Sequence, residues 1–496
     1  MRKNLNKILT LIVAAALVLP SCQKDFQQIN TDPNGTSNAQ PQQLLAPALV
    51  NTLTINMLRS RNFNNELMQV TVDPGDSEGK VFRYDVKRTW ADYTWNGWYT
   101  QLMNFKDIYD IAARPEINNK AFMGIGQICQ VWLFSLLTDT YGDIPYSQAL
   151  KARDGNFSPA FDKQQDIYPD LFKRLEEANT LLTGAANVPS NSDPVFAGNA
   201  SKWRKFGNSL YLRLLLRVSG KAEASAAVIT KIKQIVDTNA SDYPIMVDNS
   251  DAAVLRWTGV GALTSPFVGG VREQDWRALN IAEFFINNLN TWQDPRLVQF
   301  RWPIATYMGS YVGVPSGYTP GQGVVSKSYF LSTTSATTLM TDPLMGNIMN
   351  FSELQFILAE AATKGWISGS AANYYKNGVL TGITFWIPTY TTPIDTYMTA
   401  ADINWNESLS LDGKMEKIHL QKYYSMFWTD FEQWFEYRRT GHPILPKGAG
   451  LRNNGVMPAR LTYPVYVQSA NAANYSAAVA AQGPDEINTQ VWWQRP

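Results

Sequence analysis

The stretch that decides the fold is FSELQFILAEAATKG, residues 351–365, which is followed after a short connection by AANYYKNG, residues 371–378. Its apolar residues recur at helical spacing, and the small side chains of Ala359 and Ala362 would let a second helix approach closely. Gly365 stands where the first helix should end. The stretch therefore predicts two closely packed helices joined by a turn.

Helical periodicity extends well beyond this unit, over residues 122–136, 167–178 and 203–217. A helix pair of this kind is similar to a tetratricopeptide unit, which stacks with its neighbours to bury the apolar faces. We therefore expect a mainly all-α fold, a tetratricopeptide-like helix-pair scaffold with long irregular loops and minor β-hairpins. A single domain over 41–496 should carry loop inserts near 71–98 and 245–340, and residues 441–496 should be loop-like, because these parts are rich in turn-forming residues.

The N-terminus predicts export and a lipid anchor. Residues 1–21 combine three positive charges, an apolar run from Ile8 to Leu19 and a small residue before Cys22, which together are typical of a secretory signal peptide. A cysteine directly after the cut suits a bacterial lipoprotein, in which this thiol receives the lipid. Residues 22–40 then form a polar, lipidated tether. The alternative is an ordinary signal peptide followed by a chance cysteine.

Composition excludes some classes of function. The 496 residues are 45% hydrophobic, enough for a large core, and a net charge of +1 gives no reason to expect a nucleic-acid partner. We expect no stretch after the signal peptide to be both long and apolar enough to span a membrane. Cys129 lies in an apolar helical pattern and should be a small core residue.

Motifs of catalysis and cofactor binding are missing from the sequence. It has no phosphate-binding loop, and its Gly-x-Ser-x-Gly match, residues 75–79, falls within the predicted loop insert 71–98 and not between a predicted strand and a predicted helix. His419 and His442 are its only histidines, and their spacing does not suit a zinc site. We therefore expect no cofactor, no metal and no catalytic residue.

Two carboxylate pairs in the sequence have a spacing that needs an explanation. Asp139 and Asp143 could act as an acid/base pair, but they flank a turn after an apolar helix, where binding backbone N–H groups is the favoured interpretation. Glu432 and Glu436 lie one helical turn apart, with Arg438 and Arg439 close behind. This arrangement favours a salt-bridged helix end.

Aromatic residues account for 12% of the chain, and many lie in segments predicted as loops. Trp98 falls on a helix with Leu102 and should be core. Indole and phenol rings stack on the C–H faces of sugars, and nearby Asn, Asp, Arg and Gln can bind the hydroxyls. Burial beneath the loops is the alternative for each ring. The candidate ligand-binding residues are Arg83, Trp90, Tyr93, Trp95, Trp276, Trp302, Tyr307 and Tyr318.

Several short segments, in this order, resemble one family. They are SCQKDF with INTDPN (21–26 and 29–34), TDTYGDIPY (138–146), WRKFGNSL (203–210), the Ser352-Glu353 unit, QKY (421–423), EQWFEYRRTG (432–441), PARLTYP (458–464) and QGPD (482–485). The chain resembles the SusD/RagB-type outer-membrane nutrient-binding lipoproteins of Bacteroidota, in the SusD-like branch, nearly from end to end.

The resemblance implies a lipid-anchored, non-catalytic protein on the outer face of the outer membrane. It would cap a SusC-type TonB-dependent transporter barrel and deliver a captured glycan, or alternatively a peptide. Two further alternatives are an exported helical glycoside hydrolase and a helical-repeat scaffold that binds only proteins. No family motif fixes the ligand residues, which are inferred from loop position and aromatic chemistry.

Overall fold

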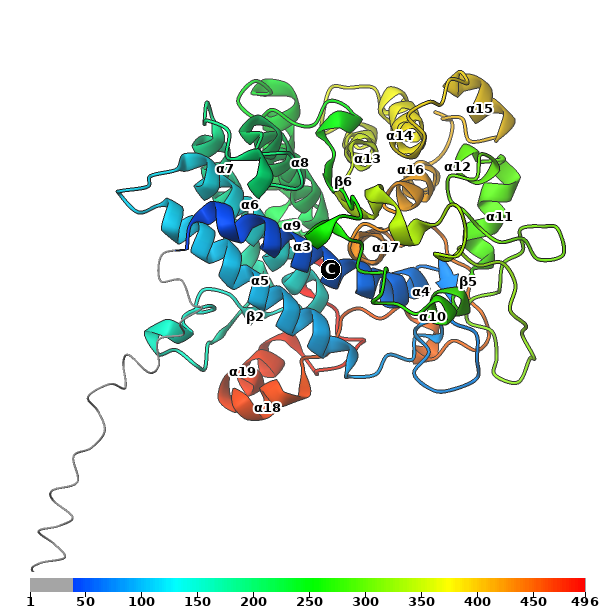
Figure 1. Ribbon diagram of the computed structural model, residues 1–496, viewed down its shortest axis with the longest axis horizontal. Helices are drawn as coiled ribbons and strands as arrows, with labels where there is room; N and C mark the ends of the chain where they lie inside the picture. Colours follow the sequence, from blue (N-terminus) through cyan, green and yellow to red (C-terminus); the bar gives the residue numbers. More distant parts are fainter. Residues whose placement is uncertain (1–38, 496) are drawn as a thin grey trace, which may run out of the picture. The chain divides into compact units, whose positions relative to one another are not determined.

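The helix pair predicted from the sequence is present in the computed structural model. It consists of α13 (Phe351–Thr363) and α14 (Ala371–Trp386) (Figure 1). The Asn350 side chain accepts a hydrogen bond from the Glu353 N–H at 2.9 Å and so caps α13. Gly365 has φ +71°, a left-handed conformation that suits the residue after a helix end. The helices approach closely at Gly378 of α14, where a Cβ would lie 2.7 Å from the Phe356 ring.

The structure describes residues 39–495. The predicted signal peptide (1–21), the predicted lipid-attachment residue Cys22 and nearly all of the predicted tether (22–40) lie outside the described residues. Residues 41–496 form one compact unit.

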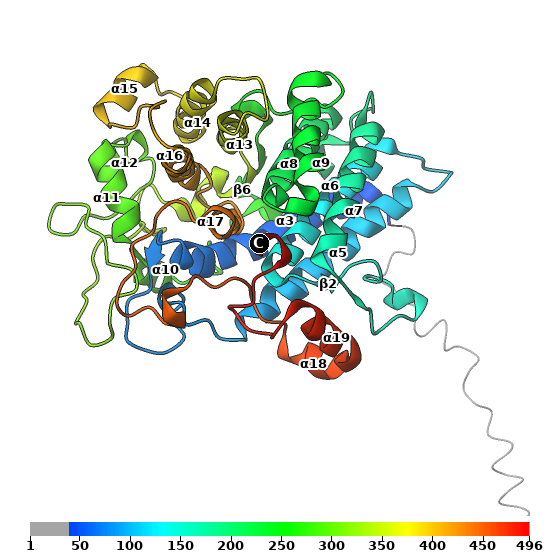
Figure 2. The ribbon, with the colours of Figure 1, turned by 180° about the vertical axis from the view of Figure 1, so that it is seen from behind.

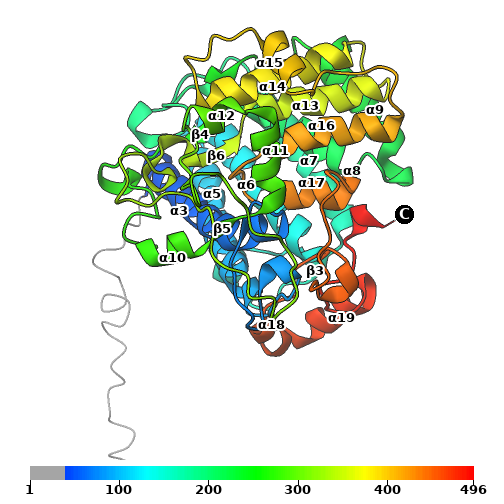
Figure 3. The same ribbon diagram turned by 90° about the vertical axis from the view of Figure 1, so that its right-hand side faces the viewer.

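Two groups of helices make up this unit. In the first, α3 packs on α5, α5 on α6, α6 on α7, α7 on α8 and α8 on α9 (Figure 2). In the second, α16 packs against both α13 and α14 (Figure 3). The contact between α8 and α13 joins the groups.

The bounds of the remaining helices are α3 (Pro41–Arg59), α4 (Asn65–Leu67), α5 (Trp90–Ala112), α6 (Lys120–Tyr141), α7 (Gln164–Leu182), α8 (Ala200–Val218), α9 (Ala222–Lys233), α10 (Glu273–Ala278), α11 (Glu283–Trp292), α12 (Pro295–Val298), α15 (Ile394–Ala400), α16 (Leu411–Ser425), α17 (Glu432–Thr440), α18 (Val465–Ala470) and α19 (Ala472–Gln482).

Helix α6 forms the centre of the first group. It is long and apolar enough to cross a membrane, so the expectation that no stretch after the signal peptide could do so is wrong. However, 94% of its most apolar stretch is buried inside the protein, as expected for the core helix of a folded domain. Cys129 is fully buried on this helix, which confirms its assignment to the core, and burial raises the pKa of its thiol.

Strands are minor elements, as predicted, but only one pair joins neighbouring segments. β2 (Ile144–Pro145) pairs with β3 (Phe161–Asp162). The pairs β1 (Thr71–Val72) with β5 (Asn280–Ile281), and β4 (Ala253–Leu255) with β6 (Gly346–Met349), each join segments far apart in the sequence. These two pairs are therefore not hairpins. The first fastens the two loop inserts to each other, and the second fastens the insert 245–340 to the segment that precedes α13.

The loop inserts contain more helix than the sequence predicts. Helix α5 begins at Trp90, so the last part of the predicted insert 71–98 is helical, because Ala91, Trp95 and Trp98 follow the helical period and are buried along one face. The predicted insert 245–340 contains α10, α11 and α12, and the C-terminal region contains α18 and α19. Trp98 is fully buried, which confirms its assignment to the core.

Candidate ligand-binding site

The end of α3 and the start of α5 form a candidate site beside a π-helical turn. Helix α3 ends at Arg59, and the chain continues as a π-helical turn over Ser60–Asn64. Such wider turns are frequent at functional sites. Here the turn brings Arg59, Arg61 and Asn62 beside Tyr93, on the first turn of α5.

Two adjacent pockets open at this place. The arginine pocket, of about 250 Å³, is lined by Leu58, Arg59, Arg61, Asn62, Tyr93, Gly270, Val271 and Asp275. The acidic pocket, of about 320 Å³, shares Arg61, Asn62 and Asp275 with it and adds Glu66, Asp73, Lys80 and Trp90. Together the two pockets have the size of a small-ligand site.

Arg59 organises the aromatic side of the arginine pocket. Its Cζ lies 4.3 Å from the ring centroid of Tyr93 and 5.1 Å from that of Trp90. Trp90 is half-buried between Arg59 and Phe63, whose ring centroid is 5.6 Å away. Tyr93 is 36% exposed. Of the two predicted rings at this site, Tyr93 therefore offers the more open surface to a ligand.

Charge in the acidic pocket is largely paired or neutral. Asp73 forms an ion pair with Lys80 at 2.6 Å. Burial, reinforced by the nearby Asp73, raises the pKa of Glu66 to about 8, so this carboxyl is mostly protonated at neutral pH. The carboxylate of Asp275 is held by both ends of the Arg272 guanidinium, at 2.7 and 2.8 Å.

Several polar atoms around these pockets are buried without a partner among the described residues. They include the Nε atoms of Arg59 and Arg61 and the Oδ1 atom of Asn62. Leaving such atoms unpaired is costly, and binding an oxygen-rich ligand would remove the cost for those it reaches.

Trp95 lies on another face of α5 and lines a different hollow. This aromatic cleft, of about 770 Å³, is formed by the rings of Trp95, Tyr99, Phe157, Phe161 and Tyr466 together with the amides of Asn96, Asn104 and Asn471. Trp95 is buried at its base, whereas Phe157 and Tyr466 are exposed.

Arg83 and Tyr318 are buried side by side, where both contact the loop that contains Gly75. The Tyr318 ring stacks on Phe82 at 5.2 Å, and the Arg83 Cζ lies 5.2 Å from the Tyr318 ring centroid. Arg83 donates a hydrogen bond to the Gly75 carbonyl, and the Tyr318 hydroxyl accepts one from the Gly75 N–H at 2.7 Å. These residues fix the loop that borders the acidic pocket.

Trp276 and Trp302 are core residues in this structure. Trp276 stacks on Trp428 at 6.2 Å, and its Nε1–H donates to the Leu331 carbonyl at 2.9 Å. Trp302 is 0% exposed and packs 4.5 Å from the ring centroid of Phe427. For both, the alternative of burial beneath the loops describes what the structure shows. Tyr307 is half-buried in a tight turn closed by its N–H and the Ser310 carbonyl at 2.8 Å.

Asp139 and Asp143, the carboxylates considered for catalysis, are buried and already hydrogen-bonded. Asp139 accepts hydrogen bonds from the Tyr168 hydroxyl and the Trp493 indole, both at 2.7 Å. Asp143 accepts one from the Gln164 N–H at 2.9 Å, the backbone role predicted for it. Neither geometry presents an acid/base pair to a substrate.

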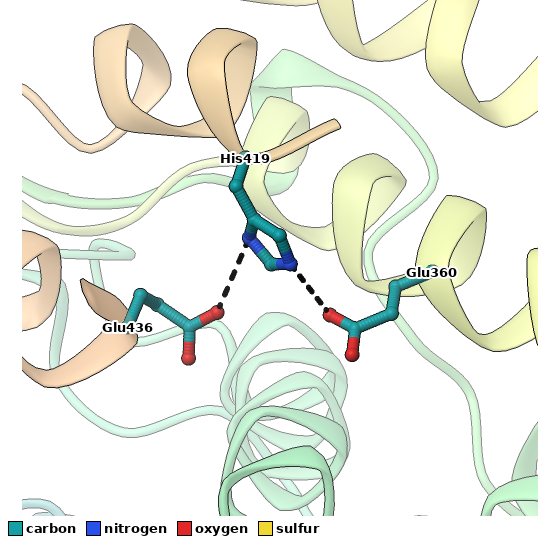
Figure 4. A group of neighbouring side chains, drawn as sticks. All are labelled: Glu360, His419 and Glu436. Atoms are coloured by element: carbon teal, nitrogen blue, oxygen red, sulfur yellow. Dashed lines mark ion pairs between the residues drawn. The ribbon is translucent and has the colours of Figure 1, made fainter. Parts of the chain in front are cut away.

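Glu360, His419 and Glu436 converge in the core in an arrangement that could suggest a metal centre (Figure 4). Both carboxylates already have cationic partners. Arg439 donates to both Glu360 oxygens at 2.8 and 2.7 Å, and Lys422 donates to Glu436 at 2.6 Å. The Arg439 and Lys422 charges would repel a metal ion, so the group acts as an ion-pair network. Arg439 also pairs with Glu436 at 2.9 Å, as the predicted salt-bridged helix end requires.

The protein is mainly helical and carries this pair of solvent-facing pockets. A family model described as "Starch-binding associating with outer membrane" (SusD-like) matches residues 33–464, and the chain belongs to this family. The resemblance inferred from the sequence is therefore confirmed, as is the mainly helical, tetratricopeptide-like fold. No curated protein matches the chain.

Solved structures agree with this assignment. A SusD homolog from Bacteroides uniformis has 24% identity and a TM-score of 0.78, covering 92% of this chain and 100% of its own. A chitin-binding SusD homolog from Flavobacterium johnsoniae has 21% identity and a TM-score of 0.77, covering 92% of this chain and 98% of its own. Another structure, a chitin-binding protein, has 26% identity and a TM-score of 0.75, covering 92% of this chain and 100% of its own.

Sequence reasoning missed Arg59, Arg61 and Asn62. A basic residue at the end of an apolar helix is usually explained by the helix dipole, which hides a binding role. The one available signal was the group Arg59-Ser60-Arg61-Asn62, two arginines and an amide directly after an apolar helix.

Proposed function

We propose that this protein is a non-catalytic, lipid-anchored nutrient-binding protein of the cell surface that captures a glycan in the arginine and acidic pockets. It then delivers the glycan to a TonB-dependent outer-membrane transporter. The observation that carries the glycan proposal is the exposed Tyr93 ring beside unpaired Arg and Asn atoms. A sugar needs this combination of an aromatic surface and hydrogen-bonding groups.

Family membership supports the cellular part of the proposal. The family is starch-binding and associates with the outer membrane, and two of the similar structures are chitin-binding proteins. The buried and engaged Asp139 and Asp143 support binding without turnover, against the alternative of a helical hydrolase. A peptide ligand is the second candidate, because phenol rings and arginines also bind peptides.

A glycan array and a peptide pool, probed with the full-length protein in detergent, test the proposal. We expect glycan binding without product release, and we expect Tyr93→Ala to weaken it about 10-fold or more, the effect of losing one stacking ring with its hydroxyl contact. Tyr466→Ala, which removes an exposed tyrosine from the aromatic cleft, is the matched control and should leave affinity unchanged. Loss of binding in Tyr466→Ala but not in Tyr93→Ala would move the glycan to the aromatic cleft and overturn the proposed site.

A further inference from the structure

Arg59 is an arginine whose charge has no counterpart. Its side chain forms no ion pair and no hydrogen bond with any residue between 39 and 495. Its Nε atom is buried. A guanidinium carries five N–H donors, and arginines withdrawn from water are normally paired with a carboxylate or phosphate.

The aromatic neighbours of Arg59 do not use these donors. A guanidinium that stacks on a ring, as Arg59 can on Tyr93 at 4.3 Å, engages the ring with its face. Its N–H groups lie in the guanidinium plane and stay available for oxygen atoms. Stacking thus holds the guanidinium in place and leaves its N–H donors free to bind a ligand.

Nearby carboxylates do not neutralise Arg59 either. Burial lowers the pKa of Arg59, and the groups that counter this effect are the phenols of Tyr93 and Tyr141, not a carboxylate. The one carboxylate that lines the arginine pocket, Asp275, is held by Arg272.

Arg61 adds a second cation on the same wall. It donates a hydrogen bond to the backbone carbonyl of Asp275, and its Nε atom is buried without a partner. It forms no ion pair within 4.0 Å in the described part of the chain. Two arginines without an ion pair therefore line a pocket of about 250 Å³ beside an exposed phenol ring, with Glu66, Asp275 and Asp73 near enough to Arg61 to oppose the lowering of its pKa by burial.

From this geometry we infer that the ligand is an acidic glycan, whose carboxylate or sulfate group is held by Arg59 and Arg61 while a sugar ring lies on Tyr93. This inference rests on the proposed function and specifies its ligand. A carboxylate and a sulfate ester both offer two oxygens to a guanidinium fork, so the structure assigns the shared anionic chemistry.

Calorimetric titration of the full-length protein in detergent distinguishes the two sources of negative charge, a sugar carboxylate and a sulfate ester. One arm uses oligogalacturonate and its fully methyl-esterified form, which has the same rings without the charge. A second arm uses a sulfated galactan oligosaccharide and its desulfated form. We expect at least one acidic ligand to bind about 10- to 100-fold more tightly than its neutral partner, with affinity falling as salt rises.

Substitutions at Arg59 test whether this residue causes the preference for acidic over neutral glycans. Arg59→Gln should weaken binding of the acidic form much more than binding of the neutral form and so remove the acid preference, and Arg59→Lys should retain part of that preference. Arg153→Gln makes the same change of charge at a remote, exposed site and should have no effect. Thermal unfolding of each variant shows whether the fold is kept.

The outcomes distinguish this inference from the proposed function. Equal binding of the acidic and neutral forms, or equal weakening of both by Arg59→Gln, overturns the acidic ligand but leaves glycan binding standing. Binding of acidic peptides only, with dependence on Arg59, overturns the glycan while the anion site stands. Failure of all glycans and peptides to bind overturns both.

Discussion

Arg213 and Glu353, which are 140 residues apart in the chain, form a buried ion pair with two parallel hydrogen bonds. Arg213 Nε donates to one carboxylate oxygen at 2.7 Å, and Nη2 donates to the other at 2.6 Å. Both side chains are only 1% exposed. The pair joins α8 of the first helix group to α13 of the second, so it lies at the contact between the two groups.

Removing the charge of Glu353 should destabilise the protein strongly. Glu353→Gln removes the carboxylate that is hydrogen-bonded to the buried Arg213 guanidinium and leaves Glu432, at 3.6 Å, as its remaining ion-pair partner. Breaking a buried pair in this way costs up to about 3–5 kcal/mol of unfolding free energy. Urea denaturation followed by circular dichroism measures this change. The control is Asp395→Asn, which breaks the exposed pair with Lys376 and should cost about 0–1 kcal/mol. Equal effects of the two variants would show that the buried pair does not hold the groups together.

The close approach of α13 and α14 gives a second prediction. A Cβ at Gly378 would meet the Phe356 ring at 2.7 Å, so Gly378→Val should force the helices apart and cost about 1–3 kcal/mol. Gly220→Ala is the control, because a Cβ there meets nothing within 4 Å. Thermal unfolding of both variants checks the difference, and a Gly378→Val protein as stable as the wild type would contradict this account of the packing.

The sequence predicted the helical scaffold more completely than it predicted the candidate binding site. The apolar period of residues 351–365, the small alanines and Gly365 are local signals, and they predicted the helix pair correctly. Burial of a ring in an insert depends on pairings that no local pattern shows. Trp302 packs against Phe427, from a distant part of the chain, whereas Tyr93 has Arg59 over its ring and stays 36% exposed.

Cys22 lies outside the described residues, and its role stays a prediction. If its thiol carries the lipid, Cys22→Ser should move the protein from the membrane fraction to the soluble fraction and lower uptake of the glycan. Fractionation of cells and an uptake assay measure these two effects. Ser21→Ala, which keeps a small residue before the cysteine, is the matched control. A Cys22→Ser protein that stays membrane-bound and supports normal uptake would refute the anchor.

Glu66 should make stability and ligand binding depend on pH. Its pKa of about 8 in the folded protein lies above the usual value of 4.5, chiefly because the side chain is buried, with Asp73 adding to the effect and Lys80 and Arg61 opposing it. Between pH 4.5 and 8 the folded protein keeps a proton that the unfolded chain releases. The folded state then binds more protons, so this contribution to stability falls as pH rises through that window.

Glu66→Gln should remove this contribution, so the variant should lose less stability than the wild type between pH 5 and pH 8. Urea midpoints at the two pH values measure the difference, with exposed Glu78→Gln as the control. Asp430, whose pKa burial raises to about 7, acts with the same sign in all three proteins and cancels from the comparison. Above pH 8, ionised Glu66 adds a negative charge to the acidic pocket, so an acidic ligand should bind the wild type more weakly at pH 9 than at pH 7, and Glu66→Gln should bind it equally at both. Parallel loss of stability and affinity in the wild type and Glu66→Gln would show that Glu66 does not hold its proton in the folded protein.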